Sequence, residues 1–181
     1  MKRALLAAVL TVPLAGCVFA GRGGVVTGQP MPSGSTPADA CAPQHLAAMA
    51  GKPVTAAIAA NPGLSGMVAG LDRAGLRTLD DVPALTLFAT SDRFLATFPF
   101  RRIRVLWDNP EELARTLEQA AVAERLQPDR LPGTYPTMAG TRAVITTDSG
   151  GLRVNGVKVE CRQLDTANAA VYIVDELVPQ R

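Results

Sequence analysis

The sequence predicts one mixed domain of helices and strands, and three observations support this class. A β-favouring segment at 86–88 leads directly into a helical pattern that Ser91 or Asp92 can cap. Further helical patterns with N-cap residues lie between 54 and 125, and alternating apolar residues between 144 and 174 predict strands. A chain of 181 residues is long enough for one domain with a substantial core.

The N-terminus has the pattern of an export signal. Two basic residues precede an apolar run from Ala4 to Val12, which is too short to span a membrane. Leu14 to Cys17 read Leu-Ala-Gly-Cys and resemble the bacterial lipobox, in which the cysteine becomes the lipidated first residue. We therefore expect residues 1–16 to be a signal peptide and Cys17 to anchor the chain to the cell membrane, facing the extracytoplasmic side. The alternative is an ordinary signal peptide that is cut elsewhere.

Residues 17–40 are rich in Gly, Pro, Ser and Thr and are expected to form a flexible tether after the lipidated cysteine. A coil of this length spans roughly 25–30 Å root-mean-square. Removal of residues 1–16 takes away two of the 18 basic residues and none of the 16 acidic ones. The remaining chain is formally neutral, which argues against a nucleic-acid partner.

The cysteines predict one disulfide. With Cys17 lipidated, Cys41 and Cys161 remain as a pair in a compartment that permits disulfides. We predict that they are bonded, at the start and near the end of a domain at 41–181; two separately buried thiols are the alternative. His45 is the only histidine, and nothing near it completes a metal site, so we expect a surface histidine and no metal or cofactor.

The first half of the domain is expected to be largely helical. Residues 54–60 form a short helix, and Asn61 starts another that Gly75 ends in the left-handed conformation. Asn109 is the N-cap of a third helix, which we expect to continue to about Arg125.

A basic cluster precedes this third helix. Arg101, Arg102 and Arg104 lie near Trp107 and suggest a binding surface, although a solvated face is the interpretation that we favour.

The second half is expected to be mainly strands. Residues 128–140 are rich in Pro and Gly and are expected to contain many turns. Strands follow from 144, and Asn155-Gly156 predicts a tight two-residue hairpin turn. The alternation after this turn places Cys161 toward the core or the N-terminal segment, and residues 170–174 form the closing strand.

Two of these segments together resemble the signature segments of the fasciclin domain family. The first is Thr86 to Leu95 (TLFATSDRFL) and the second is Asn168 to Pro179 (NAAVYIVDELVP). The intervening TMAG at 137–140 and VNG at 154–156 are also similar to the family. The resemblance covers about residues 53–179 and is closest to the single-domain bacterial secreted and lipoprotein type.

The resemblance implies an α+β fold, a wedge of two small β-sheets with helices packed on one side. It also implies that the signature residues are structural, with Asp92 as a helix cap and Asp175 as a satisfied acceptor at a strand end. These residues are Thr86, Phe88, Ala89, Asp92, Asn168, Val171, Asp175 and Pro179. The cysteine pair also resembles that of small secreted members.

The sequence departs from the family at one position of note. The family's Tyr-His pair falls on Gln119-Ala120, and in some animal members that region is linked to integrin adhesion. Since both side chains are absent here, that activity is not carried over.

Catalysis is not expected. Asp148 to Gly151 read Asp-Ser-Gly-Gly, an echo of the trypsin-like nucleophile segment that a hairpin turn explains. His45 and Ser149 have no motif around them that would make a hydrolase, and no clustered carboxylates are present.

We therefore expect a cell-surface lipoprotein with one fasciclin-like interaction or adhesion domain, bound to the membrane through lipid and to an extracellular protein or cell-wall component. The alternative is a membrane-tethered binding protein for a small apolar or glycan ligand.

Overall fold

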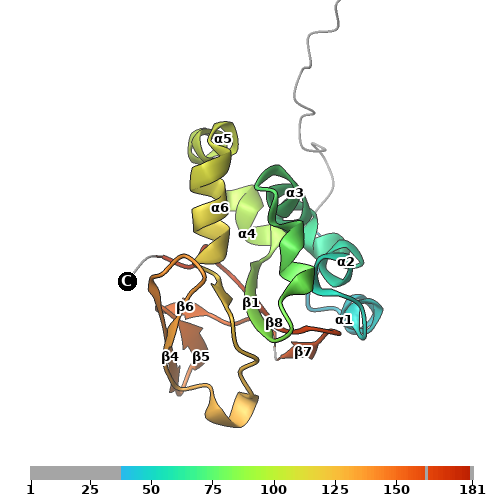
Figure 1. Ribbon diagram of the computed structural model, residues 1–181, viewed down its shortest axis with the longest axis vertical. Helices are drawn as coiled ribbons and strands as arrows, with labels where there is room; N and C mark the ends of the chain where they lie inside the picture. Colours follow the sequence, from blue (N-terminus) through green and yellow to red (C-terminus); the bar gives the residue numbers. More distant parts are fainter. Residues whose placement is uncertain (1–37, 162, 180–181) are drawn as a thin grey trace, which may run out of the picture. The chain divides into compact units, whose positions relative to one another are not determined.

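The computed structural model describes residues 38–161 and 163–179, in which helices dominate the first half and strands the second (Figure 1). The helices are α1 (Pro43–Met49), α2 (Val54–Ala59), α3 (Ser65–Arg73), α4 (Asp92–Thr97), α5 (Phe100–Asp108) and α6 (Pro110–Glu118), with 3₁₀ turns η1 (Pro62–Leu64), η2 (Leu76–Asp81) and η3 (Pro128–Arg130). The strands are β1 (Leu85–Thr90), β2 (Ala121–Val122), β3 (Gly133–Pro136), β4 (Arg142–Asp148), β5 (Gly151–Val154), β6 (Val157–Lys158), β7 (Leu164–Asp165) and β8 (Ala169–Val174). The expected signal peptide and nearly all of the expected tether lie outside the described residues.

In the described part of the chain, the strands form two four-stranded sheets, ordered β2-β1-β8-β7 and β3-β4-β5-β6. Figure 1 shows the helices grouped on one side of the first sheet and the second sheet on the other. β1 and β8 are parallel neighbours in register from Leu85↔Ala169 to Thr90↔Val174. The α+β wedge of two small sheets with helices on one side is thereby confirmed.

The central pair, β1 and β8, separates two hydrophobic cores. Every residue of both strands is buried. Because side chains alternate across a strand, Leu87 and Val171 face the core formed with the helices, while Phe88 and Tyr172 face the core formed with the second sheet. Phe88 and Tyr172 stack there with ring centroids 5.7 Å apart. Burial on both faces explains why both strands are nearly continuous apolar runs.

In the middle of the chain, one sequence prediction is wrong and one strand was missed. The third helix ends at Glu118 and not near Arg125, because Ala121 and Val122 leave it to pair with β1. The turn-rich segment 128–140 also contains β3, which the sequence did not predict and which pairs with β4. Both errors concern short strands whose partners lie far away in the sequence.

The predicted turns are correct. Asn155 and Gly156 have φ values of 49° and 91° and join β5 to β6, as a tight hairpin turn requires. The Asn155 side chain accepts a hydrogen bond from Val144 N–H at 2.7 Å and donates to Pro179 O at 2.8 Å. Gly75 has a φ of 71° after α3, as expected of a helix-ending glycine.

Asn168, just before β8, connects three distant segments through its side-chain amide. Its Oδ1 accepts from Val54 N–H at 2.9 Å, at the start of α2. Its Nδ2 donates to the carbonyls of Leu79, Asp80 and Val82 at 2.9, 3.3 and 3.0 Å, at the end of η2. A helix start and the end of a 3₁₀ turn are thus fixed to the sheet by one residue.

We predict that Asn168→Ala lowers the free energy of unfolding by roughly 2–3 kcal/mol, because it leaves one backbone donor and several carbonyls without their partner. Urea denaturation measures this change. The neighbouring exposed Ala167 supplies a control, since Ala167→Ser is expected to shift stability by less than about 0.5 kcal/mol. A comparably small effect of Asn168→Ala would contradict the role assigned to the amide.

Candidate functional site

The signature residues on the two central strands are structural. Thr86, Phe88, Ala89 and Val171 are all buried within the sheet. The Thr86 hydroxyl donates to Glu124 O at 2.6 Å and accepts from Leu126 N–H at 2.9 Å, so it holds the chain that follows β2. None of these four side chains is available to an external partner.

Asp92 caps a helix, but not the helix that it begins. Its carboxylate accepts hydrogen bonds from the backbone N–H groups of Ser65 and Gly66, both at 2.8 Å, and from the Ser65 hydroxyl. These are the first residues of α3, whose orphan donors Asp92 satisfies from 27 positions further along the chain. The sequence identified the type of role correctly and assigned it to the wrong helix.

The remaining signature residues lie after β8. Asp175 donates its backbone N–H to Lys158 O at 3.3 Å, and among the described residues its carboxylate accepts no hydrogen bond. The expected acceptor role of Asp175 therefore has no support in this part of the structure. Pro179 is held by its carbonyl, which accepts from Asn155.

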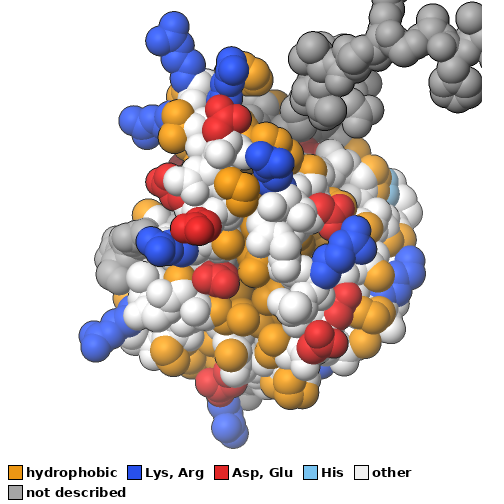
Figure 2. All heavy atoms as spheres, turned by 45° about the horizontal axis from the view of Figure 1, so that its top comes forward, with side chains coloured by type: hydrophobic (Ala, Val, Ile, Leu, Met, Phe, Trp, Pro, Cys, Tyr) orange, Lys and Arg blue, Asp and Glu red, His pale blue; other side chains and the backbone are white. Residues whose placement is uncertain are grey.

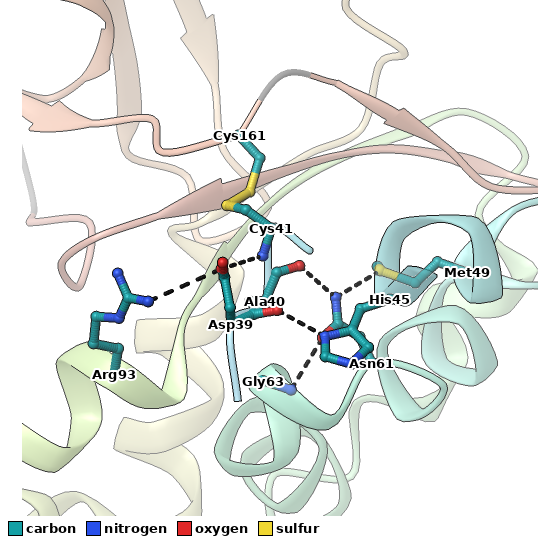
Figure 3. Close-up of a disulfide and its surroundings, with 9 residues drawn as sticks. All are labelled: Asp39, Ala40, Cys41, His45, Met49, Asn61, Gly63, Arg93 and Cys161. Atoms are coloured by element: carbon teal, nitrogen blue, oxygen red, sulfur yellow. Dashed lines mark hydrogen bonds and ion pairs between the residues drawn. A yellow bond between two sulfur atoms is a disulfide. The ribbon is translucent and has the colours of Figure 1, made fainter. Parts of the chain in front are cut away.

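A disulfide joins Cys41 to Cys161 across 120 positions, with their Cα atoms 5.7 Å apart, in agreement with the predicted pairing (Figure 3). Figure 3 also shows the segment before Cys41 lying against the domain. Ala40 is buried, and its carbonyl accepts from Asn61 Nδ2 at 2.9 Å. A Cβ atom on Gly63 would lie only 2.6 Å from the Ala40 backbone, so this contact requires glycine.

The folded part therefore begins before residue 41, and residues 38–40 of the expected tether belong to it. Asp39 fixes this segment further, because its carboxylate accepts from Cys41 N–H at 2.9 Å and lies 4.0 Å from Arg93. His45 Nδ1 lies 2.7 Å from Asp39 O, so the single histidine of the chain also holds the segment before Cys41 against the domain.

We predict that Cys161→Ser makes Cys41 reactive toward alkylating reagents and lowers the melting temperature. The chain-entropy estimate for so long a closed loop is about 4–5 kcal/mol. Mass spectrometry of the Cys41 peptide after alkylation without reductant measures the first effect, with the unsubstituted protein as control. An alkylated Cys41 in that control would contradict the disulfide.

The segments that suggested chemistry are structural in this fold. Asp148 Oδ1 accepts from Gly150 N–H at 2.7 Å and its Oδ2 accepts from Arg153 Nε at 3.1 Å, within the turn that joins β4 to β5. The hydrogen bond from the Gly150 N–H is the largest cause of a lowered pKa of the Asp148 carboxyl, and the hydrogen bond from Arg153 is the second.

Among residues 38–161 and 163–179, no three His, Cys, Asp or Glu side chains gather as metal ligands would. In the same residues, no helix is long and apolar enough to cross a bilayer.

A hollow of about 310 Å³ lies along α6 where the family carries its Tyr-His pair. Its lining is polar and consists of Asn109, Glu111, Glu112, Arg115, Thr116 and Gln119. Gln119 and Ala120 are buried, and Ala120 O accepts from Phe88 N–H at 2.8 Å. This position therefore supports the sheet, and the hollow above it offers charged and amide groups.

Among the residues that the structure describes, the two most exposed large apolar side chains belong to α5. Phe100 is 74% exposed and Val105 is 62% exposed, and no residue of the helix is buried. Only Leu106 and Trp107 pack against the helical core. Arg101, Arg102 and Arg104 are exposed with Phe100 and Val105, and we call these five residues the α5 face.

The sequence identified only part of this face. It grouped Trp107 with the arginines, whereas the structure turns Trp107 inward and the arginines outward. Phe100 and Val105 were missed, although a spacing of 100° per residue places Val105 beside Arg101 and away from Trp107.

The first turn of α5 is locally unfavourable in the isolated domain. Arg101 and Arg102 lie at the positive end of the helix dipole, and no acidic residue compensates them in that turn. Cations there destabilise an exposed helix by roughly 0.3–1 kcal/mol each. The exposed Phe100 side chain also contributes little hydrophobic stabilisation to the fold. Residues that do not favour the folded state of their own segment are expected at functional sites.

The fold and this surface together define a small α+β domain with an exposed basic and apolar helix. The sequence profile of the fasciclin domain family matches residues 62–179, and the chain belongs to this family. It is 28% identical over 141 residues to immunogenic protein MPB70 of Mycobacterium bovis, covering 75% of this chain and 73% of that protein. The same identity and length relate it to cell surface glycolipoprotein MPB83 of M. bovis, of which 64% is covered.

A solved structure supports the fold. The chain is similar to a FAS1 domain pair from the insect cell adhesion molecule fasciclin I, with a TM-score of 0.54 and 18% identity. The match covers 65% of this chain and 46% of the solved chain.

Proposed function

We propose that this protein is a surface-attached, non-catalytic interaction domain that binds a component of the cell envelope through the α5 face. The component is an extracellular protein, a wall polymer or the membrane surface. The observation that carries the proposal is the exposure of Phe100 and Val105 on the same helix as three exposed arginines, while only Leu106 and Trp107 of that helix pack against the core. Exposed apolar patches with polar rims are typical of interaction sites.

Lipid anchoring at Cys17 is part of the proposal. The Leu-Ala-Gly-Cys sequence supports it, and MPB83, a relative, is named a cell surface glycolipoprotein. A lipid-modified Cys17 would hold the domain on the extracytoplasmic side, where a disulfide is stable.

The alternative is a binding protein for a small apolar or glycan ligand, and the apolar ligand has the less support of the two. Such sites are mostly apolar hollows with a few placed polar groups. The hollow along α6 is instead lined by polar and charged side chains.

We predict that Cys17→Ser releases the protein from the membrane fraction, because no lipid can then be attached. Fractionation of cells followed by immunoblotting measures this, and Cys161→Ser serves as a control that retains Cys17. Continued membrane fractionation of Cys17→Ser after a high-salt wash would contradict lipid anchoring.

We also predict that Phe100→Ser combined with Val105→Ser weakens binding of the Cys17→Ser protein to isolated cell envelopes at least fivefold. The melting temperature should change little, because both side chains are exposed. Met138→Ser is the matched control, since Met138 is 37% exposed and lies outside the α5 face. Equal envelope binding by all three proteins would remove the α5 face from the proposed function.

A further inference from the structure

The corner between α4 and α5 concentrates aromatic and basic side chains. Three of the five phenylalanines of the chain, Phe94, Phe98 and Phe100, lie within seven positions here. The rings of Phe94 and Phe98 are in contact, with centroids 5.4 Å apart, and both residues are half-buried. Phe100 follows them as the exposed member of the group.

Charge is segregated along the chain at this corner. The arginines occupy the first half of α5, while Asp108, Glu111 and Glu112 lie at its end and at the start of α6. Arg104 is partly neutralised by Asp108, 3.6 Å away. Among the described residues, Arg101 and Arg102 form no ion pair, so the positive charge is greatest next to Phe100. Figure 2 shows Lys and Arg side chains projecting from the part of the domain where Figure 1 places α5.

We infer that the first turn of α5 docks on an anionic lipid surface. Arg101 and Arg102 bind lipid phosphates, and Phe100 enters the boundary between headgroups and acyl chains. Guanidinium groups bind phosphate oxygens through two parallel hydrogen bonds, and an aromatic ring beside them adds apolar burial. This inference rests on the proposed function and names the partner of the same face.

The size and chemistry of the face favour a lipid surface over a protein. A nine-residue helix is only roughly 13 Å long, whereas a stable protein interface buries about 800 Å² on each partner. A bilayer is continuous and needs no complementary shape, so a few basic side chains around one aromatic residue are sufficient for contact. The unfavourable placement of two arginines at a helix N-terminus is relieved when anionic phosphates lie opposite them.

The test uses the full chain with Cys17→Ser, so that attachment does not depend on lipidation. Its probe is co-sedimentation with vesicles of mixed phosphatidylglycerol and phosphatidylcholine, against vesicles of phosphatidylcholine alone. We expect binding only to the anionic vesicles and a decrease in binding as salt increases. Each arginine near such a surface contributes on the order of fivefold in affinity.

The test substitution is Arg101→Glu with Arg102→Glu, which should weaken vesicle binding at least tenfold. The matched control is Arg142→Glu with Lys158→Glu, which changes the net charge equally at exposed positions of the second sheet. The control is expected to bind within about twofold of the parent. The reason is that salt screens the attraction between the surface and any charge that lies more than a Debye length from it. Phe100→Ser should weaken binding without changing its salt dependence.

Three outcomes would overturn the inference: no binding to anionic vesicles, equal binding to both vesicle types, or equal losses in the test and control proteins. If the parent fails to bind vesicles but still binds isolated envelopes through the α5 face, the partner is a protein or wall polymer. The proposed function would then stand while the lipid partner would be wrong.

Discussion

The parallel contact between β1 and β8 is the constraint on which the rest of the structure depends. It brings together two segments that lie far apart in the chain and buries both strands on both faces. Because successive side chains point in opposite directions, this one pair of strands contributes side chains to both hydrophobic cores and separates them. A polar substitution on either face would leave a buried group without a partner, which accounts for the apolar character of both segments.

The other elements are fastened to this pair by polar side chains that act over long distances. Asn168 holds the start of α2 and the end of η2, Asp92 holds the start of α3, and the disulfide holds the segment before α1. The two polar side chains satisfy backbone groups that would otherwise lack a hydrogen-bond partner. The disulfide lowers the conformational entropy of the unfolded chain. Asn168 and Asp92 are two of the signature residues that the family resemblance marked. None of the signature residues lies in α5, which contacts the core only through Leu106 and Trp107.

Local sequence patterns predicted the features that depend on neighbouring residues. The Asn155-Gly156 turn, the Gly75 helix end and the Asn109 cap each involve groups within a few positions of one another. The end of α6 and the strand β3 could not be found in the same way, because a partner strand elsewhere in the chain decides both. The sequence showed the arginines of the α5 face as a cluster but did not show that Phe100 and Val105 are exposed. Exposure depends on whether other elements of the fold pack over the helix.

The sequence by itself determined the family, the mixed helix and strand class, the pairing of Cys41 with Cys161 and the local turns. The turns follow from short-range chemistry, the family from the order of its signature segments, and the disulfide from the number of cysteines left once Cys17 is assigned to the lipid. Only the tertiary structure decided which core each side chain of β1 and β8 enters, that Asp92 caps α3, and that Phe100 stands exposed at the same end of α5 as Arg101 and Arg102. The physical reason is that burial and capping depend on which distant surfaces meet, and no local pattern records that.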